Sequence, residues 1–149
     1  IARNVSEEVS AVTRSYSELV KIYGVVGDMP TNAQMTAAVL IEKINQILIH
    51  DELIKRLGIE TLDYLVREKL KTIEENESVI AGAEKLYGFP FAVLENMIFR
   101  PQAESDILSS TLFAKNIKLD DWLLDARKQS RVTLLHPGMQ WNGEVVAAK

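Results

Sequence analysis

The sequence predicts a mainly α-helical fold: an irregular multi-helix bundle of about five to six helices with a C-terminal β-hairpin or extended arm. Up to about residue 126, apolar side chains recur every three or four positions, as along one face of a helix. Glycine, proline and capping residues interrupt this pattern. Beyond Ser130 a strand-like run and turn formers replace it. We expect a helical domain over residues 1–130 and an arm over residues 131–149, packed on that domain or on a partner.

The first predicted helix covers residues 5–23 and carries one narrow apolar stripe. Glu7 and Glu8 place acidic charge near its start, where the macrodipole favours it, and Gly24 with Gly27 can end it. The stripe recurs at alternating intervals of four and three residues, like a coiled-coil seam. Its members are Val5, Val9, Val12, Tyr16, Leu19 and Tyr23. So narrow a stripe on an otherwise polar helix predicts contact with a partner.

The second predicted helix has a much wider apolar face and is expected to be central. Residues 28–30 break the chain, and Thr31 or Asn32 can cap the new helix. The apolar pattern then continues to Leu57, which leaves open one long helix or two stacked pieces.

Gly58 marks the next corner, and a third helix is expected to follow it. Apolar residues at helical spacing run from Leu62 to Ile73. Two continuations are open: the helix runs on to Tyr87, or Ser78 caps a fresh start.

Gly88 and Pro90 indicate a stop and a restart before a short, very apolar helix over residues 91–99, which we expect Arg100-Pro101 to end. Its apolar side chains would cover nearly all sides of the helix, more than one core face can absorb. We therefore predict a partner surface made of Phe91, Leu94, Met97, Ile98 and Phe99.

Two more helices complete the predicted count of six. One covers about residues 104–115 and stops at Asn116, and the last is capped by Asp120. Near the end of this last helix stands the one basic cluster of the chain, Arg127, Lys128 and Arg131. Such residues offset the helix macrodipole, and an anion or an acidic partner segment is the alternative reading of the cluster.

The arm is expected to pair as a small hairpin. Residues 132–135 are strand-like, Pro137-Gly138 and Asn142-Gly143 favour turns, and residues 145–146 are again β-branched. Two short strands are marginal alone, so the arm must lie against its own helices or a neighbouring subunit. Met139 and Trp141 are side chains of the kind that anchor interfaces.

The composition excludes several classes of protein. The chain has no cysteine, which rules out disulfides and thiolate sites and favours a reducing, cytoplasmic compartment. The apolar runs fall far below the ~20 residues that span a bilayer, so we expect no membrane insertion. The first ten residues hold no apolar secretory core, and the opening Ile1 leaves the native start undetermined.

Residues 52–70 raise the alternative of a helix-turn-helix that reads DNA, because a short glycine turn joins two predicted helices. However, Ile54 occupies a position that needs a small residue, and the second helix has as many acidic as basic side chains. Residues 72–106 add seven acids against two bases, whereas DNA affinity depends on neutralising phosphates. This balance disfavours nucleic acid. We expect an ordinary corner, with Gly58 ending one helix and Ile59 packing back.

No pattern for catalysis, for a cofactor or for a metal stands out. Neither His50 nor His136 follows a glutamate by three residues, and the sequence contains no glycine-rich phosphate loop and no Gly-x-Ser-x-Gly elbow. We therefore name no catalytic, cofactor-binding or metal-binding residue. The sequence favours a non-enzymatic subunit acting through protein contacts, as a homo-oligomer or in a larger complex. An accessory subunit of an enzyme complex is a further alternative.

Overall fold

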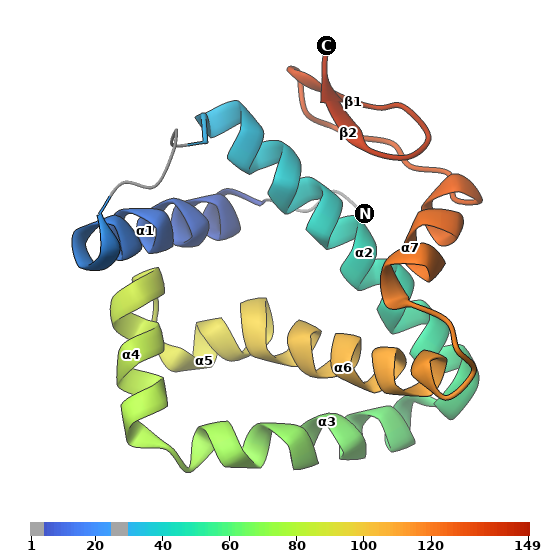
Figure 1. The fold of residues 1–149 in the computed structure, drawn as a ribbon, viewed down its shortest axis with the longest axis horizontal. Coiled ribbons are helices and arrows are strands. Elements are labelled where there is room, and N and C mark those ends of the chain that lie inside the picture. Colours follow the sequence, from blue (N-terminus) through green and yellow to red (C-terminus); the bar gives the residue numbers. More distant parts are fainter. Residues whose placement is uncertain (1–4, 25–29) are drawn as a thin grey trace.

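The computed structural model describes residues 5–24 and 30–149, and it has the predicted mainly helical fold with a C-terminal hairpin (Figure 1). The expectations for Ile1, Gly27, Asp28 and Met29 lie outside the described residues. A π-helical turn, Glu95–Phe99, joins α5 to α6. The other elements in chain order are α1 (Ser6–Tyr23), α2 (Asn32–Leu57), α3 (Ile59–Glu74), α4 (Glu77–Tyr87), α5 (Phe91–Leu94), α6 (Arg100–Phe113), α7 (Leu119–Lys128), β1 (Met139–Trp141) and β2 (Val146–Ala148).

Helix α2 is one continuous helix of 26 residues. Thr31 begins it with a capping box, in which its hydroxyl accepts from the Gln34 backbone N–H while the Gln34 side chain accepts from the Thr31 N–H. Gly58 ends it at a φ of 81°, which a residue with a side chain adopts only with strain. The expectation that Ile59 packs back at this corner is wrong, because its side chain is 68% exposed.

After α3 the structure has a separate helix, α4, and not a continuation of α3 to Tyr87. The chain turns at Glu75, and α4 leads away from α3 along one edge of the molecule (Figure 1). The cap is Asn76 and not Ser78: the Asn76 side chain accepts from the Val79 backbone N–H at 3.2 Å.

The expected helix end at Arg100-Pro101 is wrong, because the helix continues from Phe91 to Phe113. Proline lacks an N–H and its ring collides with the carbonyl four residues earlier in a regular α-helix. Here the turn before Pro101 is widened, with the Arg100 N–H donating to the Glu95 carbonyl five residues back. The widened turn accommodates the proline. With residues 91–113 counted as one helix, the described chain has six.

The last helix also begins differently from the expectation. The N-cap residue is Lys118, which makes no side-chain cap, and not Asp120. Asp120 lies inside the first turn, where the helix macrodipole stabilises its negative charge. The stop before it is as predicted, since Asn116 adopts a left-handed conformation with φ 64°.

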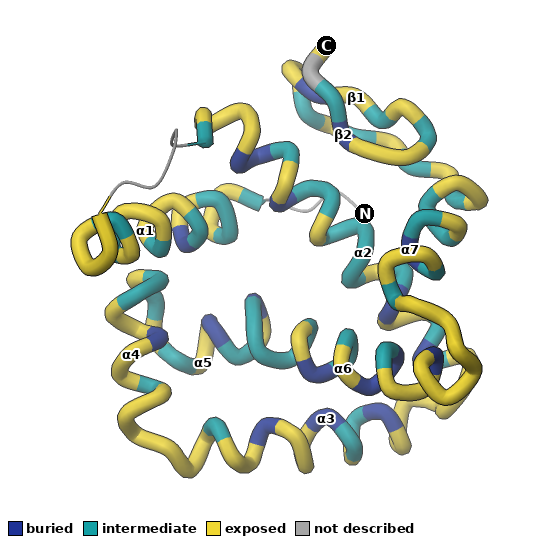
Figure 2. The backbone as a smooth tube through the Cα atoms, in the orientation of Figure 1, coloured by how far each residue is buried: buried dark blue, intermediate teal, exposed yellow. Residues whose placement is uncertain are grey.

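The hydrophobic core lies where α2, α3 and α6 pack together and α7 closes one end (Figures 1 and 2). Helices α3 and α6 run side by side, and α2 crosses both of them near Gly58. The buried members of this core are Ile49, Leu53, Leu62, Val66, Leu70, Ala103, Ile107, Leu108, Leu112 and Leu123.

The hairpin forms, although its strands are not all where the sequence placed them. Residues 132–135 belong to neither strand; β1 and β2 pair antiparallel with Gln140 opposite Ala147. The Asn142 side chain accepts from the backbone N–H groups of Glu144 and Val145, which forms the predicted turn. The hairpin packs against α2 of its own chain, so residues outside the strand pair cover its apolar face.

Candidate protein-binding surface

Helix α1 is attached to the rest of the fold through a line of small and polar side chains. Ala11 is its one buried residue, and α2 and α4 are the helices that α1 contacts most. Arg14 donates from Nε to the Lys85 carbonyl at 3.2 Å in the last turn of α4, and Glu8 pairs with Lys43 of α2 at 2.6 Å. The contacts that hold α1 are therefore partly polar, unlike those of the core.

The apolar stripe of α1 is only half covered by this attachment. Val5, Val9 and Val12 are half-buried, whereas Tyr16, Leu19 and Tyr23 are exposed, Tyr23 to 76%. Successive helix positions point about 100° apart. The helix line through Ala11 is one position off the stripe. On the last turns of α1 both lines are exposed, since Ile22 continues the Ala11 line and is 67% exposed.

Ile22 extends this exposed area and was missed by the sequence analysis. It is 67% exposed and lies beside Leu19 and Tyr23 on the last turns of α1. It falls outside the four-and-three spacing of the stripe, so that pattern could not include it. One sequence signal could have identified it. Ile22 shares a helix face with Glu8, Ala11, Ser15 and Glu18, and a large apolar residue is unexpected on such a small and polar face. The surface formed by Tyr16, Leu19, Ile22 and Tyr23 is called the α1 patch below.

The apolar segment 91–99 is largely used by the chain itself. Leu94 and Met97 are buried, and Phe99 is half-buried against the core of α2, α3 and α6. Phe91 and Phe99 are half-buried neighbours, with ring centroids 5.6 Å apart. Ile98 is also half-buried. Much of the apolar surface of this segment is covered because the segment is the beginning of a long helix and packs against α4 and α6.

The two side chains proposed as anchors in the arm differ in their placement. Met139 is buried, so it offers no surface to a partner in this conformation. Trp141 is half-buried, and its indole Nε1 is enclosed without a hydrogen-bond acceptor among the described residues. Burying a donor without an acceptor costs free energy, which makes Trp141 a weak point of the hairpin packing.

The basic cluster at the end of α7 is mostly occupied by internal contacts. Arg127 donates to the Asn45 side-chain oxygen at 2.8 Å and to the Glu144 carbonyl at 3.0 Å, which ties the hairpin to α2. Lys128 lies 3.6 Å from the Glu144 carboxylate. Arg131 lines the groove between α2 and residues 130–136, which neither Arg127 nor Lys128 lines. The structure therefore does not gather the three side chains into one anion site.

A groove of about 960 Å³ runs between α2 and residues 130–136. Its α2 wall is apolar and includes Leu40, Ile44 and Ile47. On the opposite wall the side chains alternate: Val132, Leu134 and His136 are half-buried, and the residues between them are exposed. This period of two is that of a strand, which explains why the sequence predicted one there.

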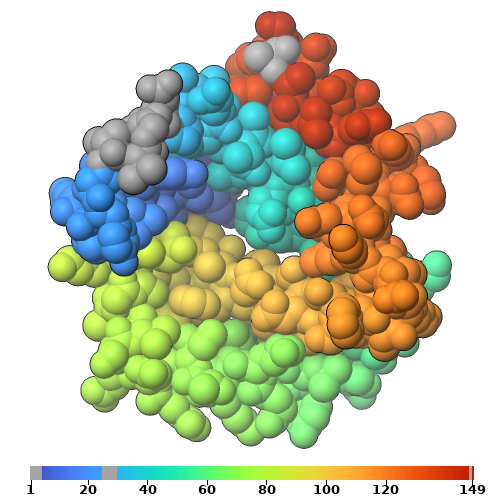
Figure 3. Space-filling model, in the orientation of Figure 1, coloured from blue at the N-terminus to red at the C-terminus, as the bar shows by residue number. Residues whose placement is uncertain are grey.

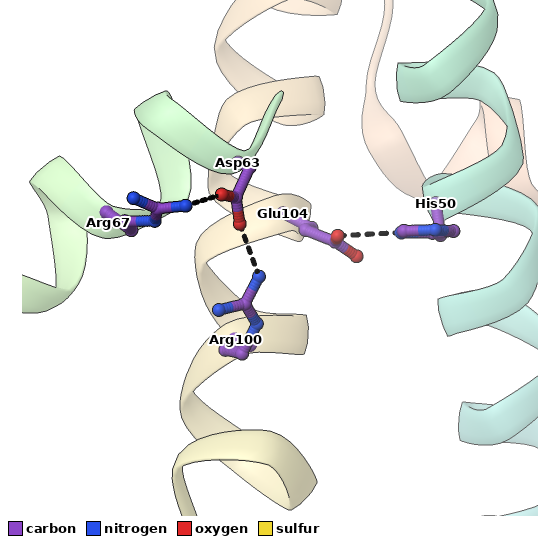
Figure 4. A network of polar contacts seen from close by, with 5 residues as sticks. All are labelled: His50, Asp63, Arg67, Arg100 and Glu104. Atoms are coloured by element: carbon purple, nitrogen blue, oxygen red, sulfur yellow. Dashed lines mark hydrogen bonds and ion pairs between the residues drawn. The ribbon is translucent and has the colours of Figure 1, made fainter. Parts of the chain in front are cut away.

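Polar contacts in the core region join α6 to α3 and to α2 (Figure 4). From α6, Arg100 donates to Asp63 of α3 at 3.1 Å, and Glu104 lies 2.7 Å from His50 Nδ1 of α2. Arg67 also pairs with Asp63, and the guanidinium groups of Arg100 and Arg67 lower the pKa of this carboxyl below its ordinary value. These contacts clamp three helices together, which accounts for their geometry without a substrate.

Side chains of the α2–α3 corner are engaged within the chain. Ile54 packs on the hydrophobic core, where the helices of a reader need a small residue. Arg67, which faces outward from α3, is engaged by Asp63. Within residues 5–24 and 30–149 no cluster of histidine, aspartate and glutamate could hold a metal ion. Among the same residues, no helix has the length and apolar character needed to cross a membrane.

Comparisons with known proteins give no relative for this arrangement: no family model, no curated protein and no solved structure matches the chain. The class of protein that the fold defines is a small mainly helical bundle with a C-terminal hairpin.

Proposed function

We propose that this chain is a non-enzymatic helical subunit that acts through protein–protein contacts, by self-association or within a larger complex. The observation that carries the proposal is the α1 patch. Four large apolar side chains are exposed together within the last eight residues of one helix. Contiguous apolar area of this kind, with two tyrosines, is typical of surfaces that a partner covers.

The surroundings of the patch support the same function. Within α1, Lys21 pairs with Glu18 at 3.0 Å, and the interactions of Glu18 with Lys21 lower its pKa below the ordinary value. Charged groups therefore border the apolar patch, as in the polar rim of an interface. The groove beside residues 130–136 supplies a second partly apolar surface on another side of α2.

Self-association is tested by light scattering and sedimentation over a range of concentrations. We expect the native chain to form a larger species that the double variant I22S/Y23S loses, because two serines replace the most exposed apolar side chains of the patch. The matched control is I59S/Y64S on α3, since Ile59 and Tyr64 are similarly exposed, at 68% and 62%. This control should associate as the native chain does.

Hydrogen exchange gives the second measurement. In the dilute native chain we expect the amides of α1 to exchange faster than those of α3, and to slow down as the larger species forms. A monodisperse monomer at every concentration, with α1 and the hairpin as well protected as the core, would contradict the proposal.

A further inference from the structure

A cavity of about 290 Å³ lies beneath α1, between α2, the end of α4 and the widened turn that precedes α6. In Figure 3 the surface is hollowed where α1, α2 and the helix running from α5 into α6 meet. Its wall is mixed. Val12, Val39, Met97 and Ile98 provide apolar surface, and side chains from α1, α2 and α6 provide polar groups.

The charge of this cavity is unbalanced. Glu8 and Lys43 both line it and neutralise one another at 2.6 Å. Glu42, one residue before Lys43 on α2, also lines the cavity and has no ion-pair partner among the described residues. Desolvation raises the pKa of its carboxyl, although the amide groups of Asn45 and Gln46 act in the opposite direction. Glu42 is exposed, and the charge of Lys43 acts on it as well, but the ion pair of Lys43 is with Glu8. Two carboxylates therefore share one ammonium group, and the cavity keeps a net negative charge.

The π-helical turn shapes the opposite wall. Met97 and Ile98 belong to this turn, and Pro101 and Gln102, which follow it, line the same cavity. Widened turns of this kind occur frequently at functional sites, because they re-aim side chains that a regular helix would direct elsewhere. Met97 is also an adaptable side chain that fits varied apolar shapes.

We propose that this cavity binds a small amphipathic amine, with the ammonium group at Glu42 and the hydrocarbon part against Val39 and Met97. The volume admits about ten non-hydrogen atoms at ~30 Å³ for each, the share of a water molecule in the liquid. Gln46, Gln102 and Ser105 line the cavity and can hydrogen-bond further polar groups of the ligand. An anionic ligand of the same size would meet the net negative charge of the cavity and be repelled.

The test uses n-hexylamine, which is protonated at neutral pH, as the probe in an NMR titration of the full chain. Hexanol and hexanoate have the same hydrocarbon chain with no charge and with a negative charge. We expect hexylammonium to bind with a Kd of about 1 mM and to shift the amides of residues 38–46 and 97–102, with hexanol weaker and hexanoate without effect.

The matched variants are E42Q and E52Q, two glutamates of α2. Glu52 pairs with Arg56 on the same helix and does not line the cavity. We expect E42Q to weaken hexylammonium binding at least about tenfold and E52Q to leave it unchanged. The proposal is overturned if hexylammonium gives no shifts up to about 10 mM, if hexanoate binds as well, or if E42Q binds as the native chain does.

Discussion

Helices α1 and α3 carry similar sequence patterns and have different fates in the fold. Both are amphipathic helices with one apolar stripe at spacings of three and four. In α3 the stripe is covered: Leu62, Val66 and Leu70 are all at most 3% exposed. In α1 the stripe ends in Leu19 and Tyr23, which are exposed. The periodicity of a helix predicts that one face is apolar, and its neighbours decide whether that face is buried.

The difference follows from what each helix packs against. Helix α3 contacts α2, α6 and α4, and its stripe points at the long helix α6. Helix α1 contacts α2 and the short α4, and Ala11 allows a close approach on a line beside the stripe. Arg14 then fixes this rotation, because its side chain reaches the Lys85 carbonyl and lies over Gly88. Polar contacts at the end of α4 thus set the rotation of α1, and on its last turns Leu19, Ile22 and Tyr23 stay exposed on two adjacent lines.

The largest expected effect is a contrast between L70A and L19A in dilute solution. Leu70 is 2% exposed and Leu19 is 41% exposed, although both are stripe leucines. We expect L70A to lower the free energy of unfolding by about 2–5 kcal/mol, because it leaves a cavity in a packed core. L19A should change it by less than about 1 kcal/mol. Urea denaturation measures both values, and equal losses would mean that α1 is as buried as α3.

The next effect concerns the contact between α1 and α4. Gly88 has a φ of 79°, and a Cβ there would lie 2.8 Å from Arg14 Nε, too close for a real contact. We expect G88A to cost about 1–2 kcal/mol and to speed hydrogen exchange in α1, through backbone strain and displacement of Arg14. Thermal denaturation and exchange measure the two consequences.

The control for this variant is G82A, within the same helix. Gly82 has open space where a Cβ would lie, so alanine should stabilise α4 by about 0.5–1 kcal/mol. Exchange in α1 should stay as in the native chain. If G88A left α1 unaffected, Arg14 would not be what fixes its rotation.

The smallest effect is a pH dependence at the end of α3. Burial raises the pKa of the Glu95 carboxyl above its ordinary value. The neighbouring Glu74 raises this pKa further, through a hydrogen bond between the two side chains and through its negative charge. The folded chain then binds this proton more tightly than the unfolded chain, so stability is lost as pH rises from the ordinary to the raised pKa. E95Q removes this loss. We expect a rise in Tm of at most about 2 °C at pH 7 and none at acidic pH.

A matched variant for this pH experiment is E77Q in the first turn of α4. Glu77 lies where the helix macrodipole favours a negative charge, so its removal should lower Tm slightly at pH 7. If E95Q and E77Q moved Tm in the same direction at pH 7, the raised pKa of Glu95 would not explain the result.

Much of the fold could be predicted from sequence, because helix periodicity and capping are local. The α1 end at Gly24, the Thr31 start and the corner at Gly58 follow from residues a few positions apart. The continuation of the helix through Pro101 could not be predicted in this way. Proline normally ends a helix, but here the widened turn Glu95–Phe99 makes room for the proline ring and the helix continues. The spacing of apolar residues does not reveal that a helix turn is widened.

Less of the candidate site could be predicted. The stripe residues Tyr16, Leu19 and Tyr23 were recognised as apolar on a polar helix, and Ile22 was not. The cavity beneath α1 was not predicted at all. Glu42 and Met97 are 55 positions apart in the chain and line one space only after four segments have packed. Sequence spacing carries no information about such convergence.

The sequence by itself determined where most of the helices lie, their apolar faces and the hairpin turn, because each depends on residues within about four positions of one another. Only the tertiary structure decided which line of α1 docks, where the hairpin lies and which charges are left unpaired. The contacts responsible span the chain: Arg14 reaches a carbonyl 71 residues away, and Arg127 reaches Asn45 across 82. Contacts between distant residues decide which apolar face of a helix is covered, and on α1 they leave the α1 patch exposed.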